Sequence, residues 1–267
     1  RDSLSTLLNT IKSYAKINLF LNVVDKLDTG FHELNSVLSR IDLYDEIRIK
    51  DESSFSISYN GPFGDQVGSN DHVSKLFNYL IDKNYLKQKS FAIHVVKNIP
   101  VGSGLGGGSS NVAEIIKYLI RSNLLDNSSS TEIARDLGSD IEFFIDEGSA
   151  LISGKGNVEE RLKINSDKHF LIVFPNVQNS TKEIFNKHSN LSGEKFSYNK
   201  DTNLDGILKG TSNELEKTAL LANHEMKKIR EYLDNDINCK YERMTGSGSA
   251  YFTVYEDKQK AEEAIQR

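Results

Sequence analysis

Residues 99 to 113 read Ile-Pro-Val-Gly-Ser-Gly-Leu-Gly-Gly-Gly-Ser-Ser-Asn-Val-Ala, and this stretch decides the fold. It follows a short apolar run, Ile93–Lys97, that is typical of a strand, and it leads into a segment whose apolar residues recur at helical spacing. The first N–H groups of a helix lack internal partners, and glycine lets the backbone lie close to a ligand. Ser109 and Ser110 add hydroxyl groups where the helix begins. The stretch therefore predicts a loop that holds phosphate.

Two well-known phosphate loops fit this stretch poorly. Gly102, Gly104 and Gly107 satisfy the dinucleotide-binding spacing, but that fold needs a strand directly after the helix. Here a polar stretch and a second helical segment, Thr131–Leu137, follow instead. A Walker A loop would have lysine after Gly107, where this chain has Gly108. A flexible linker would not join a strand to a strongly amphipathic helix, so we favour a phosphate loop of another kind.

Composition narrows the class of protein. The chain has 267 residues, of which 37% are hydrophobic and 27% charged, and its net charge of −5 argues against a dedicated nucleic-acid binder. Cys239 is the only cysteine and the six histidines are scattered, so we expect no disulfide and no cysteine or histidine metal site. The sequence shows neither a long apolar run nor a signal-peptide pattern. We expect an intracellular, cytoplasmic protein of bacterial type, without a nucleic-acid or membrane partner.

The remaining pattern divides the chain in two. Residues 14–24 alternate like a strand, with Lys16 and Asn18 on the face opposite Ile17 and Leu19. A polar stretch from 176 to 213 suggests a change of domain near Ile164, which gives domains 1–163 and 164–267. Further strands are predicted near 45–49, 55–59, 150–152, 168–174 and 250–255, and further helices at 70–79, at 214–233 and from 257.

Three separated segments carry a resemblance: Ala15–Leu19, Pro100–Ala113 and Thr245–Ser249. Together they resemble the GHMP small-molecule kinases, named for galactokinase, homoserine, mevalonate and phosphomevalonate kinases. Within this superfamily, Gly30–His32, Gly106–Asn111 and Gly138–Phe144 are similar to one branch. Members of that branch phosphorylate a cytidine diphosphate conjugate of methylerythritol in the non-mevalonate isoprenoid pathway.

The resemblance implies an α+β fold of two-layer α/β type in two domains. Its N-terminal half would be like ribosomal protein S5 and its C-terminal half like ferredoxin, with the active site between them. It also implies ATP with Mg²⁺, transfer of phosphate to the 2-hydroxyl of the methylerythritol group, and a monomer or weak homodimer. The family normally continues through one more strand beyond the position of Arg267, and the chain lacks an initiator methionine, so we expect trimmed ends.

The family's functional residues fall on named positions of this chain. Lys16 and Asp140 fall on the catalytic lysine and aspartate. Glu142 stands where the family usually has proline, which leaves the carboxylate of Asp140 in place. The ATP-binding positions are Asn70, Lys97, Pro100, Gly102, Ser103, Gly104, Leu105, Gly106, Gly107, Gly108, Ser109 and Ser110. The substrate-binding positions are Asn18, Phe31, His32, Asp140, Phe185, Thr245, Gly246, Ser247 and Gly248.

The same residues also admit simpler interpretations. Phosphoryl transfer needs a fixed positive charge and a carboxylate near the acceptor hydroxyl, which Lys16 and Asp140 would supply. Without the resemblance, the sequence supports a helix N-cap at Asp140 as well as it supports a catalytic carboxylate. For Lys16 and Lys97, it favours ordinary surface lysines over functional ones. His32 and the phenylalanines would pack by default, and Thr245–Ser249 would be a tight turn.

Two other functions remain open from the sequence. The first is another kinase of the same superfamily, of homoserine or mevalonate type, although Gly30–His32 and the triple glycine Gly106–Gly108 count against it. The second is a non-catalytic nucleotide-binding or RNA-binding module. The negative net charge and the pairing of Lys16 with Asp140 argue against that module.

Overall fold

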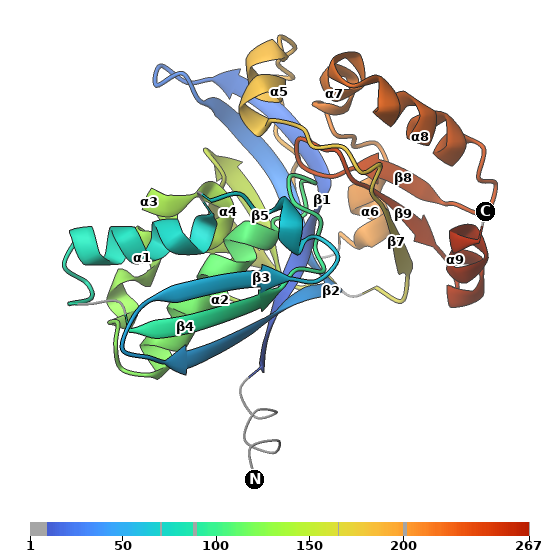
Figure 1. Ribbon diagram of the computed structural model, residues 1–267. Helices are drawn as coiled ribbons and strands as arrows, with labels where there is room; N and C mark the ends of the chain where they lie inside the picture. Colours follow the sequence, from blue (N-terminus) through green and yellow to red (C-terminus); the bar gives the residue numbers. More distant parts are fainter. Residues whose placement is uncertain (1–9, 70, 88–89, 165, 200–201, 267) are drawn as a thin grey trace. The chain divides into compact units, whose positions relative to one another are not determined.

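The computed structural model describes residues 10–69, 71–87, 90–164, 166–199 and 202–266 (Figure 1). They form two compact units. The first comprises the described residues of Arg1–Lys16, Ile41–Val101 and Gly106–Glu147, and the second those of Ile17–Arg40, Gly102–Leu105 and Gly148–Arg267. Two long strands, β1 (Thr10–Lys26) and β2 (His32–Asp51), pair with each other and contribute residues to both units.

The first unit contains a parallel strand pair joined through a helix. β3 (Ser56–Asn60) runs parallel to β4 (Phe91–Val96), with η2 (Gly64–Gln66) and α1 (His72–Asp82) between them in the chain. The C-terminal part of β2 pairs antiparallel with β4 from Glu46↔Val96 to Asp51↔Phe91. Asp71 caps α1 by accepting a hydrogen bond from the Ser74 N–H, in agreement with a helix predicted at this place.

Four helical segments follow the glycine-rich loop in the first unit. They are α2 (Gly107–Arg121), η3 (Asn127–Ser129), α3 (Ser130–Leu137) and α4 (Ser139–Ile145). The predicted apolar face of α2 is confirmed, because Val112, Ile115, Ile116 and Leu119 are buried. After α2 the chain passes through η3 into α3, so the helical segment predicted at Thr131–Leu137 is confirmed.

The second unit contains two groups of strands. The N-terminal part of β2 pairs antiparallel with β5 (Ser149–Gly154), which pairs with β6 (Asn157–Leu162). A separate antiparallel sheet has the order β7 (His169–Val173), β9 (Tyr251–Tyr255), β8 (Tyr241–Met244). The helices are α5 (Thr181–Lys187), α6 (Leu204–Leu208), α7 (Glu216–Ala222), α8 (His224–Asp234) and α9 (Lys258–Ile265).

One predicted helix is wrong in extent. The sequence pattern predicts one continuous helix over 214–233, but this stretch forms two helices, α7 and α8 (Figure 1). Asn223 has extended backbone, and its side chain accepts a hydrogen bond from the Glu225 N–H, so it ends one helix and caps the next. The expected mixed α/β fold in two parts is confirmed by these sheets and helices.

Candidate active site

Lys16 and Asp140 lie together in the first unit. Lys16 Nζ is 3.3 Å from Asp140 Oδ2, with the lysine side chain 4% exposed and the aspartate side chain 36% exposed. The interpretation of Lys16 as a surface lysine is therefore wrong, because both faces of β1 are covered around it. The interpretation of Asp140 as a helix N-cap is also wrong. Gly138 is the N-cap of α4, and Asp140 lies in the first turn, where the helix dipole favours a carboxylate.

The glycine-rich loop uses its glycines for backbone conformation and for close packing. Gly102, Gly104 and Gly106 have positive φ angles of 66°, 83° and 73°. A Cβ at Gly106, the N-cap of α2, would lie 3.1 Å from Lys16 Cγ and 3.1 Å from the Phe144 ring. The start of α2 therefore lies directly against the lysine that pairs with Asp140.

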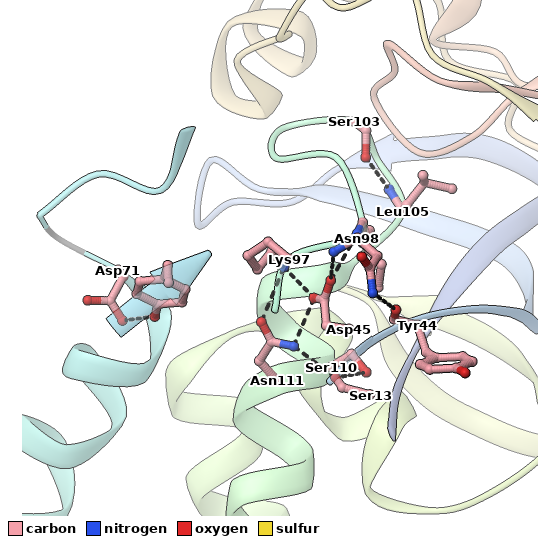
Figure 2. Close-up of polar contacts among 12 residues, drawn as sticks. Ser13, Tyr44, Asp45, Asp71, Lys97, Asn98, Ser103, Leu105, Ser110 and Asn111 are labelled. Atoms are coloured by element: carbon pink, nitrogen blue, oxygen red, sulfur yellow. Dashed lines mark hydrogen bonds and ion pairs between the residues drawn. The ribbon is translucent and has the colours of Figure 1, made fainter. Parts of the chain in front are cut away.

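A buried polar network in the first unit joins Asp45 on β2 to Asn111 near the start of α2 (Figure 2). Asp45 is fully buried, and Lys97, which is 3% exposed, forms an ion pair with its Oδ2. The Asn98 and Ile99 N–H groups donate to Asp45 Oδ1 at 2.8 Å and 2.9 Å. Asn111 Nδ2 donates to Asp45 Oδ2 at 3.0 Å. The two oxygens of this single carboxylate thus accept from four groups.

The network extends from Asn111 to β1. Asn111 Nδ2 also lies 2.9 Å from Ser13 Oγ, which donates to Ser110 Oγ at 2.8 Å. The Ser110 hydroxyl is buried and hydrogen-bonded within the protein, whereas Ser109 is partly exposed. Of the two hydroxyls predicted at the helix start, the Ser110 hydroxyl is occupied by a structural contact.

Lys97 is not a surface lysine, so that interpretation of the sequence is wrong. The pKa of Lys97 is lowered, because the effect of burial outweighs that of the neighbouring Asp45 charge, which acts to raise it. Sequence reasoning did not single out Asp45 or Asn111. The available signal was that Asp45 shares a strand face with Ile47 and Ile49, where a carboxylate needs partners.

In the second unit, Asn18 is held by the turn between β8 and β9. Its backbone N–H donates to Thr245 Oγ1 at 2.9 Å, and its side-chain Nδ2 donates to Ser36 Oγ at 2.9 Å. Thr245 is fully buried, and Ser247 Oγ lies 2.9 Å from Thr181 Oγ1. A Cβ at Gly104 would lie 2.3 Å from the carbonyl oxygen of Thr245. The structure thus brings Asn18, Gly104 and Thr245 together.

The aromatic candidates also belong to the second unit. The His32 and Phe185 rings lie 5.3 Å apart between centroids with an interplanar angle of 33°. Phe31 is 61% exposed, and Lys155 Nζ lies 4.9 Å from its ring centroid. Burial, followed by the charges of Lys26 and His188, lowers the pKa of His32. Asn70, the remaining nucleotide candidate, lies outside the described residues.

The residues that the structure describes contain neither a cluster of metal-ligating side chains nor a helix able to cross a membrane. Among those residues, no group of three or more histidine, cysteine, aspartate or glutamate side chains is arranged to hold a metal ion. No described helix is both long enough and apolar enough to cross a membrane.

Comparison with known families gives two matches along the chain. The family model described as "GHMP kinases N terminal domain" matches residues 71–151, and the model described as "GHMP kinases C terminal" matches residues 199–267. The first match contains the glycine-rich loop and Asp140, and the second contains the turn at Thr245.

Individual relatives agree with the family models. A protein of Pelagibacter ubique named 4-diphosphocytidyl-2-C-methyl-D-erythritol kinase is 35% identical over 259 residues, which cover 95% of this chain and 92% of the relative. A protein of the same name from Fervidobacterium nodosum is 34% identical over 265 residues, covering 92% of this chain and 90% of the relative.

Solved structures agree as well. A crystal structure of 4-(cytidine 5'-diphospho)-2C-methyl-D-erythritol kinase has a TM-score of 0.74 and 26% identity, covering 96% of this chain and 95% of that one. The Methanococcus jannaschii mevalonate kinase has the same fold, with a TM-score of 0.63, 17% identity, and coverage of 96% of this chain and 93% of that one. The chain therefore belongs to the GHMP kinase family.

Proposed function

We propose that this chain is an ATP-dependent kinase that phosphorylates the 2-hydroxyl group of 4-diphosphocytidyl-2-C-methyl-D-erythritol. The observation that carries the proposal is the pairing of Lys16 with Asp140 at 3.3 Å, directly against Gly106 at the start of α2. A cation, a partly exposed carboxylate and a helix N-terminus at a glycine-rich loop are what phosphoryl transfer to an alcohol requires. The names of the relatives support the choice of acceptor.

The roles follow from charge. Asp140 accepts the proton of the acceptor's hydroxyl group. At the same time, the oxygen of that hydroxyl group forms a bond to the γ-phosphorus of ATP. The bond from that phosphorus to the oxygen bridging to the β-phosphate breaks, and ADP leaves. Lys16 stabilises the negative charge on the phosphoryl group during transfer, and the first N–H groups of α2 hold the phosphates of ATP.

We assign the remaining predicted residues to binding. His32 and Phe185, whose rings are in tilted contact with each other, hold the cytosine with Phe31. Because its pKa is lowered, His32 is neutral near pH 7 and can both donate and accept hydrogen bonds to the base. Asn18, with Thr245, Gly246, Ser247 and Gly248, positions the acceptor. The nucleotide set comprises Asn70, Pro100, Gly102, Ser103, Gly104, Leu105, Gly106, Gly107, Gly108 and Ser109, together with Lys97 and Ser110, whose side chains are bonded within the protein and support the loop.

Mg²⁺ fits this assignment as a companion of the nucleotide. Magnesium bound to nucleotides takes most of its ligands from phosphate and water, so it needs few protein carboxylates. Asp140, partly exposed beside the start of α2, is the carboxylate that fits such an ion. When bound, Mg²⁺ neutralises charge on the phosphates.

We further propose a domain boundary near Ile164, a monomer or weak homodimer, and a cytoplasmic location. The boundary is supported by the two family segments, which end at 151 and begin at 199. The oligomeric state and the location rest on the family resemblance and on the composition of the chain.

An acceptor panel tests the function. ATP consumption is measured with the cytidine diphosphate methylerythritol, with mevalonate and with homoserine as separate acceptors. We expect turnover with the first alone, and production of ADP together with a phosphorylated 2-hydroxyl. Turnover with mevalonate or homoserine at a comparable rate would refute the assigned acceptor, and ATP hydrolysis that is independent of all three would refute the kinase assignment.

A further inference from the structure

Asp45 has no role in the reaction described above, yet its carboxylate is the centre of the buried network in the first unit (Figure 2). One oxygen accepts from the backbone N–H groups of Asn98 and Ile99. The other accepts from Lys97 Nζ and Asn111 Nδ2. A buried carboxylate is tolerated only when such donors replace water, so these four groups are held in fixed positions around Asp45.

The donors come from the two ends of the glycine-rich loop. Asn98 and Ile99 immediately precede Pro100, where the loop begins, and Asn111 lies in the first turns of α2, just after the loop ends. One carboxylate on β2 therefore holds the entry and the exit of the loop at a fixed separation. Fixing both ends restricts the conformations open to the loop, which preorganises its backbone N–H groups for an anion.

The network also reaches the strand that carries Lys16. Asn111 is hydrogen-bonded to Ser13, which precedes Lys16 by three residues on β1. Ser13 in turn donates to Ser110 in α2. The first turns of α2 and the N-terminal part of β1 are thus joined to the same carboxylate.

Lys97 points into this network. Its ammonium group donates to Asp45 and to Asn111 Oδ1, the latter at 3.2 Å, and it lies 3.1 Å from where a Cβ would stand on Gly107. The ammonium group therefore packs against the backbone at Gly107 and contacts Asp45 and Asn111, the side chains that hold the ends of the loop.

We propose that Asp45 is a positioning residue for the nucleotide phosphates, and that Lys97 acts on the nucleotide through Asp45 rather than by touching phosphate. The proposal rests on the proposed function, in which the loop between Pro100 and Ser110 holds ATP.

The first test is Asp45→Asn, which keeps the shape of the side chain but replaces one acceptor oxygen by a donor and removes the charge. We expect its dissociation constant for a non-hydrolysable ATP analogue, measured by calorimetry, to rise roughly 10- to 100-fold, because the loop is no longer held in place. The KM for the acceptor should stay within about twofold of wild type. Unchanged affinity for the ATP analogue in folded Asp45→Asn would overturn the proposal.

A matched control separates positioning from general loss of stability. Leu119 is a fully buried residue of α2, far along the helix from the network. Leu119→Ala should destabilise the protein by leaving a cavity but leave affinity for the ATP analogue unchanged, measured below the melting transition. An equal loss of nucleotide affinity in Leu119→Ala would show that destabilisation alone explains the effect.

The role of Lys97 is tested in a double variant. If Lys97 acts only through Asp45, then Asp45→Asn combined with Lys97→Met should bind the ATP analogue within about twofold of Asp45→Asn alone. A further tenfold loss would place Lys97 on the phosphate and refute this half of the proposal. If Asp45→Asn does not fold, Ser13→Ala tests the same network more mildly. It should weaken analogue binding severalfold, and unchanged binding would overturn the proposal.

The nucleotide measurement needs no acceptor, so the two proposals fail separately. Suppose that Asp45→Asn loses affinity for the ATP analogue, but the wild-type protein does not phosphorylate the cytidine diphosphate conjugate. That result would refute only the proposed acceptor. Wild-type turnover together with unaltered analogue affinity in Asp45→Asn would refute only the positioning role.

Discussion

Lys16 Nζ lies 3.3 Å from Asp140 Oδ2, which joins the middle of β1 to the first turn of α4. The two side chains differ in exposure, since the lysine is 4% exposed and the aspartate 36%. The buried lysine is held in a single place, whereas the aspartate is open to a molecule arriving from solvent. That asymmetry suits a fixed electrostatic group paired with a group that exchanges a proton.

Asp140→Asn should abolish most turnover while leaving the fold intact. Asparagine keeps the size of the side chain but cannot accept the hydroxyl proton, so kcat should fall by about 10²–10⁴-fold. The melting temperature should barely change because Asp140 lies at a partly exposed position. Steady-state kinetics and thermal melting measure the two effects.

Asp136 in α3 offers a matched control, because it accepts a hydrogen bond from the Tyr79 hydroxyl at an exposed position. Asp136→Asn should retain wild-type turnover. Turnover within about threefold of wild type in Asp140→Asn would be too high for a lost general base and would remove Asp140 from the chemistry.

Gly107→Ala should weaken nucleotide binding, because its Cβ would stand 2.9 Å from Ile99 Cγ2 and 3.0 Å from Ile99 Cβ. Relief of this crowding requires a shift of the loop end, so we expect the KM for ATP to rise roughly tenfold and stability to fall by about 1–3 kcal/mol. Kinetics at saturating acceptor and urea unfolding measure these changes.

Gly68 provides the comparison within the same unit, since a Cβ there meets nothing within 4 Å. Gly68→Ala should change neither the KM for ATP nor the stability. If the two alanine variants behave alike, close packing at Gly107 does not govern nucleotide binding.

The sequence predicts the local parts of this structure well. The strand, the glycine-rich loop and the buried face of α2 follow from glycine spacing and helical periodicity, which neighbouring residues determine. Lys16 and Asp140 were paired only by the family resemblance, because their distance in the sequence hides their contact in space.

The parts that could not be predicted depend on distant partners. Asp45 reads as an ordinary acidic residue in a strand, and its donors come from the chain after β4 and from α2. The simpler interpretation of Lys97 as a surface lysine fails for the same reason, since lysine is rarely buried without a partner, and the sequence does not reveal that partner, Asp45. The break at Asn223 was missed because the apolar spacing continues across it, while the local cap favours a new helix.

Thr245→Val should destabilise the protein with little change of shape. Valine cannot accept the hydrogen bond that the buried Asn18 N–H donates to Thr245 Oγ1 at 2.9 Å. Removing one partner of a buried hydrogen bond costs about 1–3 kcal/mol, so the free energy of unfolding should fall by that amount. Urea unfolding measures it. Thr245→Ser keeps the hydroxyl and should recover most of the loss, and equal destabilisation by both variants would point to packing instead.

Recognition of the acceptor should depend on the charge of His32. Its pKa is lowered first by burial and then by the charges of Lys26 and His188, so His32 is neutral above the ordinary histidine pKa of about 6.5. As pH falls through the lowered pKa, the ring gains a proton and loses its acceptor nitrogen. The stability that the neutral ring contributes above its ordinary pKa is lost over the same range.

The KM for the acceptor should therefore be constant between about pH 7 and 8 and rise below about 6.5, with the KM for ATP following a different profile. His32→Gln should have a higher acceptor KM at pH 7.5 and lose this rise at low pH, because glutamine does not titrate. His94→Gln, on β4 in the other unit, removes a histidine bonded to Ser58 and should keep the wild-type profile. If the KM for the acceptor in His32→Gln still rises below about pH 6.5, another group is responsible for the titration. His32 would then have no part in recognising the cytosine.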